Sequence, residues 1–406
     1  MSTTAFRVYP NRWSILLAFM FAVAVNQLAW ITFAPITGAA AAFYGVSDLS
    51  IGLLSLSFMA VYLVVSIPAS WLIDTFGFRV AVGVGAILTA VFGLMRGLLA
   101  ESYTWVFVAQ IGIAIGQPFI LNAVTKVAAR WFALEERATA SGLGTLAMYL
   151  GIVLGLACTP FLVLHLGIRS MLLLYGIVAI AAALVFLALA RERPPTPPCP
   201  PGQDDRALVF DGLRQVLRKR DFLLLMAVFF IGLGIFNGVT TWIEDILRPR
   251  GFSIVQAGVV GGLMVAGGIV GALVLPTLSD RQRRRVPFIL VALAGAIPGL
   301  LGITFATSYA LLLASAFCLG FFLLSAGPIG FQYGAEIGHP TPEGTSNGLL
   351  LMMGQVSGIA FILAMDAFKS PINGSMTAAL LVLSALLVLS LILATRLQES
   401  TLLTRS

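Results

Sequence analysis

The sequence predicts an all-α membrane protein of twelve transmembrane helices, built as two pseudo-symmetric six-helix bundles. Hydrophobic residues make up 59% of the 406 residues and charged residues only 10%, a balance that excludes an ordinary soluble domain. Apolar runs of ~20 residues or more recur along the whole chain, as membrane helices require. The ~10-residue alternation that is typical of a membrane barrel is not seen. Matching motifs in the two halves then indicate an internal repeat.

Twelve apolar segments and one long polar interval set the expected organisation of the chain. The interval separates the sixth segment from the seventh, and its proline run from Pro194 to Pro201 favours extended backbone. We expect an N-terminal bundle over residues 1–190, a cytoplasmic Pro-rich and basic linker over 191–220, and a C-terminal bundle over 221–406. The first apolar run is long and has no obvious cleavage site, so we expect it to stay as a span. The expected spans are 12–38, 49–73, 79–99, 104–131, 138–164, 168–190, 221–247, 254–279, 286–306, 309–335, 344–367 and 374–396.

The distribution of basic residues predicts the orientation in the membrane. With both termini placed inside, the inner loops and ends hold most of the 24 Lys and Arg residues. Because cytoplasmic loops carry an excess of Lys and Arg, this asymmetry predicts a multi-pass protein with both termini cytoplasmic. The short loops favour a prokaryotic plasma membrane, that is, a cell (inner) membrane. The basic residues left at the outer side are Arg96, Arg169, Arg248, Arg250 and Lys369.

A polar and aromatic break interrupts the first apolar segment. It begins at Asn26, includes Trp30 and runs on to Pro35. The seventh segment contains a counterpart, from Asn237 to Trp242. At ~3.6 residues per turn, Asn26 and Trp30 share one helix face. Side-chain amides in hydrocarbon are costly unless they find partners, so two symmetric ones predict a polar-lined cavity at the interface of two repeats.

A charged loop also recurs at matching places in the two halves. Asp74 follows the second span and leads to Arg79, and Asp280 follows the eighth span and leads to Arg281. Each loop consists of an acid, a turn and arginine on the inner side. Both resemble the signature loop of the major facilitator superfamily, which runs Gly-x-x-x-Asp-Arg/Lys-x-Gly-Arg/Lys-Arg/Lys. The resemblance implies the major facilitator fold, with transport by rocking of one bundle against the other, and makes these four residues candidates for gating.

Each copy of the loop departs from the family pattern. The first has Ser70 at the first glycine and Thr75 at the first base, and the second has Arg283 at the turn glycine. Two copies in a six-plus-six chain are nevertheless specific evidence, because each stands at the same place in its half.

The carboxylates of the two charged loops could interact with the N-terminal ends of helices. We expect Asp74 to lie against the positive N-terminal end of span eleven, near residues 344–346, and Asp280 against that of span five, near 138–141. A carboxylate in such a position contributes ~0.3–1 kcal/mol. Links of this kind would hold the cytoplasmic side shut until the site opens inward. The alternative is that the two acids only stop their helices and fix the topology.

Enzymatic motifs are not found. The sequence has no phosphate loop, no nucleophile elbow and no zinc-type histidine pair. The three cysteines lie far apart and suggest neither a disulfide framework nor a metal site. We therefore expect no enzyme activity, no cofactor and no nucleic-acid partner. The expected partners are a small-molecule substrate and the lipid bilayer, with the chain acting as a monomer.

Ionisable residues at membrane depth decide whether transport is coupled to an ion. The acids Glu244, Asp245 and Asp366 fall near outer helix ends, as does Arg96, so the cavity candidates are neutral amides and aromatics. This pattern favours a facilitator for a cationic or zwitterionic small molecule. One alternative is a proton-coupled exporter of drugs or amphipathic compounds, which would require one of the three acids to face the cavity. A second alternative is a non-transporting membrane receptor or scaffold.

Several stretches resemble a narrower family, the feline leukaemia virus subgroup C receptor family of facilitators. The most telling is the inner loop from Glu336 to Leu350, which is similar to the family's Glu-x-x-(Tyr/His)-Pro-x-Pro-Glu-Gly-x-Ser run. The resemblance covers most of the N-terminal half and spans ten to eleven. It implies a twelve-helix transporter of choline and ethanolamine, with haem also proposed and a lysosomal relative linked to pyridoxine export. The other stretches that carry it are 26–31, 43–46, 67–74, 110–121, 130–132 and 139–151.

The resemblance also implies a set of substrate-binding residues. The family's choline site uses an asparagine and a tryptophan in span one, a glutamine in span four, a tyrosine in span seven and a glutamine in span eleven. Asn237 stands where the tyrosine would be, which removes one aromatic wall worth ~0.5–2 kcal/mol to a quaternary ammonium. The pocket is then richer in amides and suits a substrate with more hydrogen-bonding groups. In this sequence the five positions are Asn26, Trp30, Gln117, Asn237 and Gln355.

Overall fold

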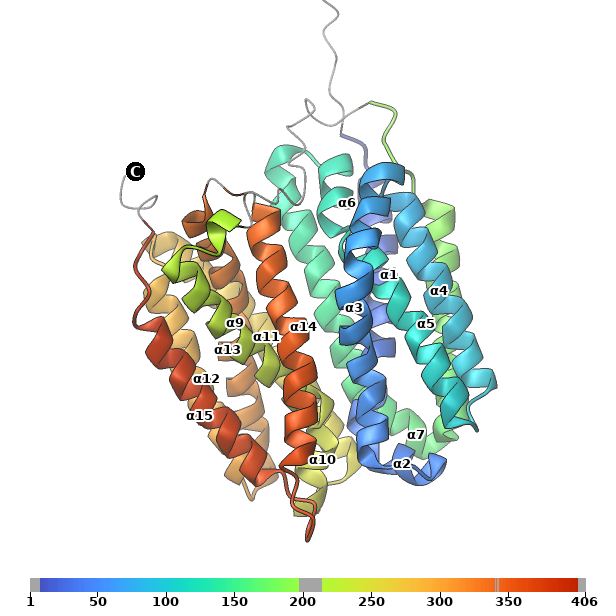
Figure 1. The fold of residues 1–406 in the computed structure, drawn as a ribbon. Helices are drawn as coiled ribbons and strands as arrows, with labels where there is room; N and C mark the ends of the chain where they lie inside the picture. The colour runs from blue at the N-terminus through green and yellow to red at the C-terminus, as the bar shows by residue number, and fades with distance from the viewer. Residues whose placement is uncertain (1–7, 197–213, 340, 342, 401–406) are drawn as a thin grey trace, which may run out of the picture. The chain divides into compact units, whose positions relative to one another are not determined.

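The computed structural model describes residues 8–196, 214–339, 341 and 343–400, apart from the side chains of 134, 343 and 344. The chain divides into two compact units, Met1–Asp204 and Asp205–Ser406. The described residues contain helices and no strand. Figure 1 shows the first unit, from blue to green, as a bundle of long helices that run along one direction. Its helices are α1 (Arg12–Ile31), η1 (Ala34–Ile36), α2 (Thr37–Tyr44), α3 (Asp48–Phe76), α4 (Phe78–Leu98), α5 (Tyr103–Leu121), α6 (Val124–Trp131), η2 (Leu134–Glu136) and α7 (Arg137–Leu189).

The second unit repeats the packing of the first. Within the first unit α1 packs on α7, α5 packs on α3 and α4, and α4 packs on α7. Within the second, α9 packs on α14, α13 packs on α11 and α12, and α12 packs on α15. The two units therefore use one pattern of neighbouring helices. The second unit's helices are α9 (Arg220–Thr241), α10 (Ile243–Leu247), η3 (Arg248–Arg250), α11 (Ile254–Gln282), α12 (Val286–Phe305), α13 (Tyr309–Gly338), α14 (Glu343–Ala367) and α15 (Thr377–Ala394).

Helix α7 contains the fifth and sixth expected spans. Its 53 residues would extend about 80 Å as one straight helix, far more than the ~30 Å hydrocarbon core of a bilayer. The backbone leaves the helical region at Gly167, where φ is 76°. The hydroxyls of Thr159 and Tyr175, sixteen residues apart, lie 2.8 Å from each other, whereas a continuous helix would hold them about 24 Å apart. The chain thus reverses at Gly167. Within the described residues, the eleven helices that are long and apolar enough to span a membrane therefore contain twelve passes, as predicted.

Two expected spans are broken near matching ends. In the first span α1 ends at Ile31, and the separate short helices η1 and α2 follow it. Pro35 explains this break, because it lacks an N–H and its ring clashes with the carbonyl of Ile31, four residues earlier. In the seventh span α9 ends at Thr241 and α10 begins at Ile243, after a β-branched run that lowers helix propensity. Discontinuous helices at corresponding places are the best structural pointer to a transport site.

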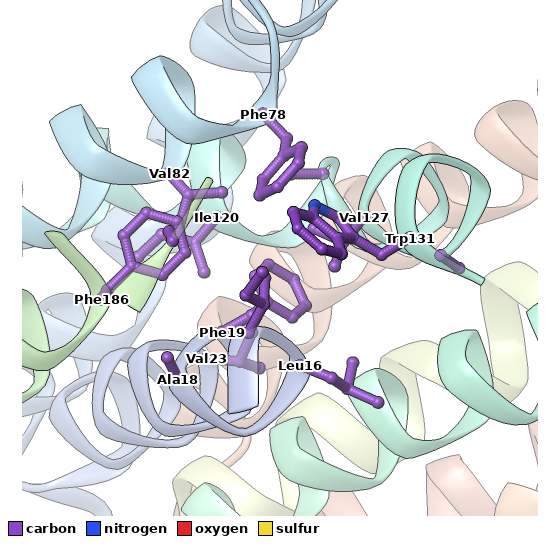
Figure 2. Close-up of a cluster of buried hydrophobic side chains, with 14 of the residues drawn as sticks. Leu16, Ala18, Phe19, Val23, Phe78, Val82, Ile120, Val127, Trp131 and Phe186 are labelled. Carbon is purple, nitrogen blue, oxygen red and sulfur yellow. The ribbon is translucent and has the colours of Figure 1, made fainter. Parts of the chain in front are cut away.

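A buried aromatic cluster fixes one end of the first unit. Figure 2 shows the rings of Phe19, Phe78 and Trp131 gathered in this cluster, together with Phe186. These four side chains come from α1, α4, α6 and the second arm of α7, so the cluster joins both ends of the unit's sequence. Each is at most 2% exposed. This end also carries the loop between α3 and α4, and we call it the loop end; in the second unit the loop end carries the turn between α11 and α12.

The expected linker lies only partly within the described residues. Residues 197–213 fall outside them, so the linker over 191–220 stays a prediction from the sequence. Its described start is attached to the first unit, since the indole N–H of Trp131 donates to the carbonyl of Arg191 at 2.9 Å and the Tyr9 hydroxyl donates to Thr196 Oγ1 at 3.1 Å.

Candidate functional site

Asn26 and Trp30 are both buried beside the break in α1. The Asn26 amide donates to Thr89 Oγ1 on α4 at 3.0 Å, and Asn26 is 0% exposed. The indole N–H of Trp30 donates to the carbonyl of Ser55 on α3 at 3.2 Å. This hydrogen bond fixes the orientation of the Trp30 ring. Trp30 is 6% exposed, so only a small part of its surface can contact a ligand in this conformation.

Gln117 supplies an amide to the first unit from α5, which packs against α1. It is 6% exposed and precedes Pro118, which lies inside the helix. A proline in this position removes one backbone hydrogen bond and leaves a carbonyl free for other donors. The first unit therefore holds three of the five predicted substrate-binding residues, on two contacting helices.

Asn237 and Gln355 lie on the packed pair α9 and α14 of the second unit. The Asn237 amide donates to the carbonyl of Gly354, the neighbour of Gln355, at 3.1 Å. Both side chains are half-buried. Trp242, at the break after α9, is 0% exposed, and its indole N–H donates to the carbonyl of Ile362 on α14 at 3.0 Å. The structure thus brings Asn237 next to the Gln355 backbone and turns Trp242 into the bundle.

The two helix breaks are anchored in the same manner. At each break an indole N–H donates to a backbone carbonyl of a neighbouring helix: Trp30 to α3 and Trp242 to α14. An amide lies about one turn before each indole, Asn26 in one unit and Asn237 in the other. Neutral amides and an aromatic face can hold an ammonium group and orient hydroxyl or carbonyl groups, but they supply no nucleophile and no proton carrier.

At the loop end of the first unit, the acid of the charged loop pairs with a base from another helix. Asp74 Oδ1 lies 3.1 Å from Lys126 Nζ on α6. The side chain of Arg79 is exposed, but its backbone N–H donates to Glu192 Oε2 at 2.8 Å, so Glu192 caps the N-terminus of α4. Between them Gly77 has φ 89° and ψ 168°, and a Cβ there would overlap the Glu192 carboxylate. Glycine is needed at this turn for both reasons.

The second unit builds the same arrangement with a larger ion cluster. Arg285, which is 7% exposed, pairs with Asp280 and, at 3.1 Å, with Glu336 on α13. Burial alone would lower the pKa of Arg285, but hydrogen bonding and charge from Asp280 and Glu336 outweigh it and raise that pKa. Glu399 accepts from the backbone N–H groups of Arg285 and Val286, both at 2.7 Å, and so caps α12 as Glu192 caps α4.

These contacts show which residues the sequence reading missed at the loop ends. Arg281, predicted for gating, has an exposed side chain, whereas Arg285 pairs with Asp280 in its place. The caps Glu192 and Glu399 and the pairing bases were not singled out. One signal was available in the sequence, because each capping glutamate follows shortly after the last span of its half. In the structure each also directly follows the residue whose carbonyl accepts from an aromatic side chain. Tyr333 donates to the carbonyl of Gln398 at 2.6 Å, just as Trp131 donates to that of Arg191.

Two of the three acids that could carry a proton, Glu244 and Asp245, lie at the opposite end of the second unit from the loop end, and both form ion pairs. Asp245 is 0% exposed and contacts Arg248 and, at 3.1 Å, Lys369 Nζ. Glu244 Oε2 lies 3.3 Å from Arg248 Nη1. Removing one partner from an ion pair with a buried carboxylate is costly, so Arg248 and Lys369 stabilise both acids in this position.

Twelve membrane passes in two units of one packing pattern, each with an acid-bearing loop and a broken first helix, define a membrane transporter. The chain belongs to the Major Facilitator Superfamily, whose family model matches residues 19–362. It is 33% identical over 388 residues to solute carrier family 49 member A3 of Xenopus tropicalis, a match that covers 91% of this chain and 80% of that protein. It is 28% identical over 406 residues to the choline/ethanolamine transporter flvcr2b of Danio rerio, covering 94% and 84% of the two chains.

The fold is also similar to that of a solved transporter structure. A bacterial homologue of the human lysosomal transporter Spinster, in an inward-facing and unoccupied conformation, aligns with a TM-score of 0.73 over 96% of both chains at 18% identity. At this identity the likeness concerns the fold alone. The fold class and the family resemblance predicted from the sequence are confirmed by these matches.

Proposed function

We propose that this protein is a facilitator for a small organic solute with an amine head group, cationic or zwitterionic, which it moves by alternating access. The observation that carries the proposal is the matched pair of helix breaks. Each break is anchored by an indole and accompanied by a neutral amide. In transporters of this architecture, substrates bind near the membrane midplane at discontinuous helices of the two repeats.

In this proposal the five predicted residues contact different groups of the substrate. Trp30 supplies an aromatic face to the ammonium group, worth ~0.5–2 kcal/mol. Asn26 and Gln117 from the first unit, and Asn237 and Gln355 from the second, orient the polar groups of the substrate. The names of relatives support an amine head group, since one similar protein is a choline/ethanolamine transporter.

The pairing of the acids supports a facilitator over a proton-coupled exporter. Proton coupling needs a carboxylate that gains and loses a proton within the cycle. Glu244 and Asp245 form ion pairs with Arg248 and Lys369, so protonating either buried carboxylate would weaken these pairs. We therefore infer that neither acid exchanges protons during transport.

We also propose that the two loop ends form the inner gate, with both termini in the cytoplasm. Asp74, Arg79, Asp280 and Arg281 lie on or beside the two charged loops. The ion pairs of Asp74 with Lys126 and of Asp280 with Arg285 support this proposal, because they hold each loop in one shape against its own unit. A rigid loop can then serve as a contact point that opens and closes as the units rock.

Uptake into proteoliposomes tests the proposed function directly. We expect radiolabelled choline or ethanolamine to enter down its gradient without a pH difference. Trp30→Ala should abolish uptake, and Trp30→Phe, which keeps an aromatic face but loses the indole bond to Ser55, should retain part of it. Trp105→Ala is the matched control, because Trp105 lies in the same unit and is 50% exposed.

Three results would count against the proposal. Unchanged uptake in the Trp30→Ala variant would remove the site assignment. Flux driven by acidification that disappears in a Glu244→Gln variant would favour the proton-coupled exporter. Binding of amines without any flux would favour a receptor.

A thermal-shift screen of the purified protein against amines, vitamins and amino-acid derivatives would identify the substrate, since a ligand stabilises the folded state that binds it.

A further inference from the structure

Arg96, in the last turn of α4, is a fully buried cation surrounded by neutral groups. Its Nη1 donates to the carbonyl of Ala29 at 3.0 Å and to Gln110 Oε1 at 2.7 Å, and its Nη2 donates to Thr32 Oγ1 at 3.5 Å. The guanidinium carbon also lies 5.6 Å from the centroid of the Phe33 ring. Arg96 is 0% exposed. Over the described residues, no Asp or Glu forms an ion pair with it.

This charge differs from every other buried charge in the described part of the chain. Arg285, Glu244 and Asp245 are also buried, but each has an oppositely charged partner. Arg96 has none, and its Nε–H has no acceptor at all. A buried charge without a counter-charge costs stability, and arginine cannot escape the cost by losing its proton. A charge kept under these conditions in a membrane protein indicates a role in function.

The position of Arg96 connects it to the candidate site. Three of its contacts, Ala29, Thr32 and Phe33, belong to the break that follows α1 or to the turn just before it. Trp30 lies inside this stretch, and Asn26 lies one turn earlier. None of the predicted substrate-binding side chains of the first unit is charged. Among these residues of the first unit, Arg96 alone is charged, so it places a positive charge beside Trp30.

We propose that Arg96 is a specificity-determining residue that favours substrates carrying an anionic group, a carboxylate or a phosphate, over substrates that carry only a positive charge. The proposal rests on the proposed function, because it requires the substrate to bind beside Trp30. A substrate group across the width of one helix lies roughly 10 Å from the guanidinium. At an effective dielectric constant of about 20, one unit charge at that distance changes affinity roughly tenfold to twentyfold.

Matched pairs of ligands test this proposal on the purified full chain. Choline and glycine betaine share a trimethylammonium head and differ in that the second carries a carboxylate. Ethanolamine and phosphoethanolamine differ by a phosphate, so the two pairs separate the two sources of negative charge. Binding of all four is measured by thermal shift and by equilibrium titration to Arg96→Gln, which removes the charge, and to Arg96→Lys, which keeps it. Arg169→Gln is the matched control, because Arg169 is an exposed arginine of the same unit, paired with Glu101.

The expected result is that the preference for the anion-bearing ligand weakens when the charge of Arg96 is removed. In the unaltered protein the anion-bearing member of at least one pair binds more tightly than its partner. In Arg96→Gln that ratio falls roughly tenfold or more, whereas Arg96→Lys and Arg169→Gln keep it.

Two outcomes would overturn the proposal. One is that neither glycine betaine nor phosphoethanolamine binds the unaltered protein better than its cationic partner. The other is that Arg96→Gln leaves the ratio unchanged. If Arg96→Gln does not fold, the proposal is judged on the affinity ratios of the unaltered protein and of Arg96→Lys, both of which should favour the anion-bearing ligand. Loss of binding of all four ligands in Trp30→Ala concerns the proposed function instead, since the Arg96 proposal is judged only on the ratio.

Discussion

The turn after α3 provides a prediction whose magnitude follows from the structure. At Gly77 the backbone has φ 89° and ψ 168°, a region that is essentially restricted to glycine. Placing alanine there costs about 2 kcal/mol in backbone strain. The new Cβ would also overlap the Glu192 carboxylate and displace it from the N-terminus of α4, which costs about 0.5–1 kcal/mol more. Gly77→Ala should therefore lower the free energy of unfolding by about 3 kcal/mol.

The overlap with Glu192 can be separated from the strain by a double-mutant cycle. Unfolding of Gly77→Ala, Glu192→Ala and the double variant is followed in mixed micelles by tryptophan fluorescence. Because the cap can be lost only once, the double variant should be more stable than the sum of the single effects predicts, by about 0.5–1 kcal/mol. The reasoning is refuted if Gly77→Ala changes the unfolding free energy by less than about 0.5 kcal/mol, the usual range of an ordinary surface substitution.

Two further predictions concern the corresponding places in the second unit. Arg283 occupies the turn with φ 51°, so Arg283→Gly should relieve left-handed strain and raise the unfolding free energy by up to about 1 kcal/mol; a loss of stability in the same assay would contradict this. Glu399→Gln should cost about 1–2 kcal/mol, because a neutral amide replaces a carboxylate that accepts from two backbone N–H groups at the start of α12, and the exposed Glu101→Gln should show no such loss in thermal unfolding.

The helices and the repeat could be predicted because a membrane helix is marked by a long apolar segment, a signal that does not depend on tertiary contacts. The hairpin in α7 illustrates this: expected spans 138–164 and 168–190 leave a gap in which Gly167 reverses the chain. The sequence predicts a polar and aromatic break from Asn237 to Trp242, but it contains no proline there to indicate that the helix itself ends. The causes of the break are a β-branched run and an indole bond to α14, and the second of these is a tertiary contact that no local pattern contains.

The partners of the charged residues could not be predicted from spacing. The sequence places Arg281 directly after Asp280, but the left-handed backbone at Arg283 turns the chain so that Arg285 pairs with Asp280 instead. Arg96 falls near a helix end, where a long basic side chain commonly reaches the membrane surface. It is buried because acceptors on α1 and α5, among them the Ala29 carbonyl and Gln110, face it from inside the bundle. Whether the five predicted binding residues hold a substrate stays a prediction.

The reversal at Gly167 has a consequence for any experiment that follows the transport cycle. The two arms of α7 are joined through a single residue, and successive Cα atoms are separated by 3.8 Å, so the arms cannot part at that end whatever happens elsewhere. Spectroscopic labels placed on either side of the junction should therefore report one constant separation in every state. They provide a fixed internal ruler against which other label pairs can be calibrated.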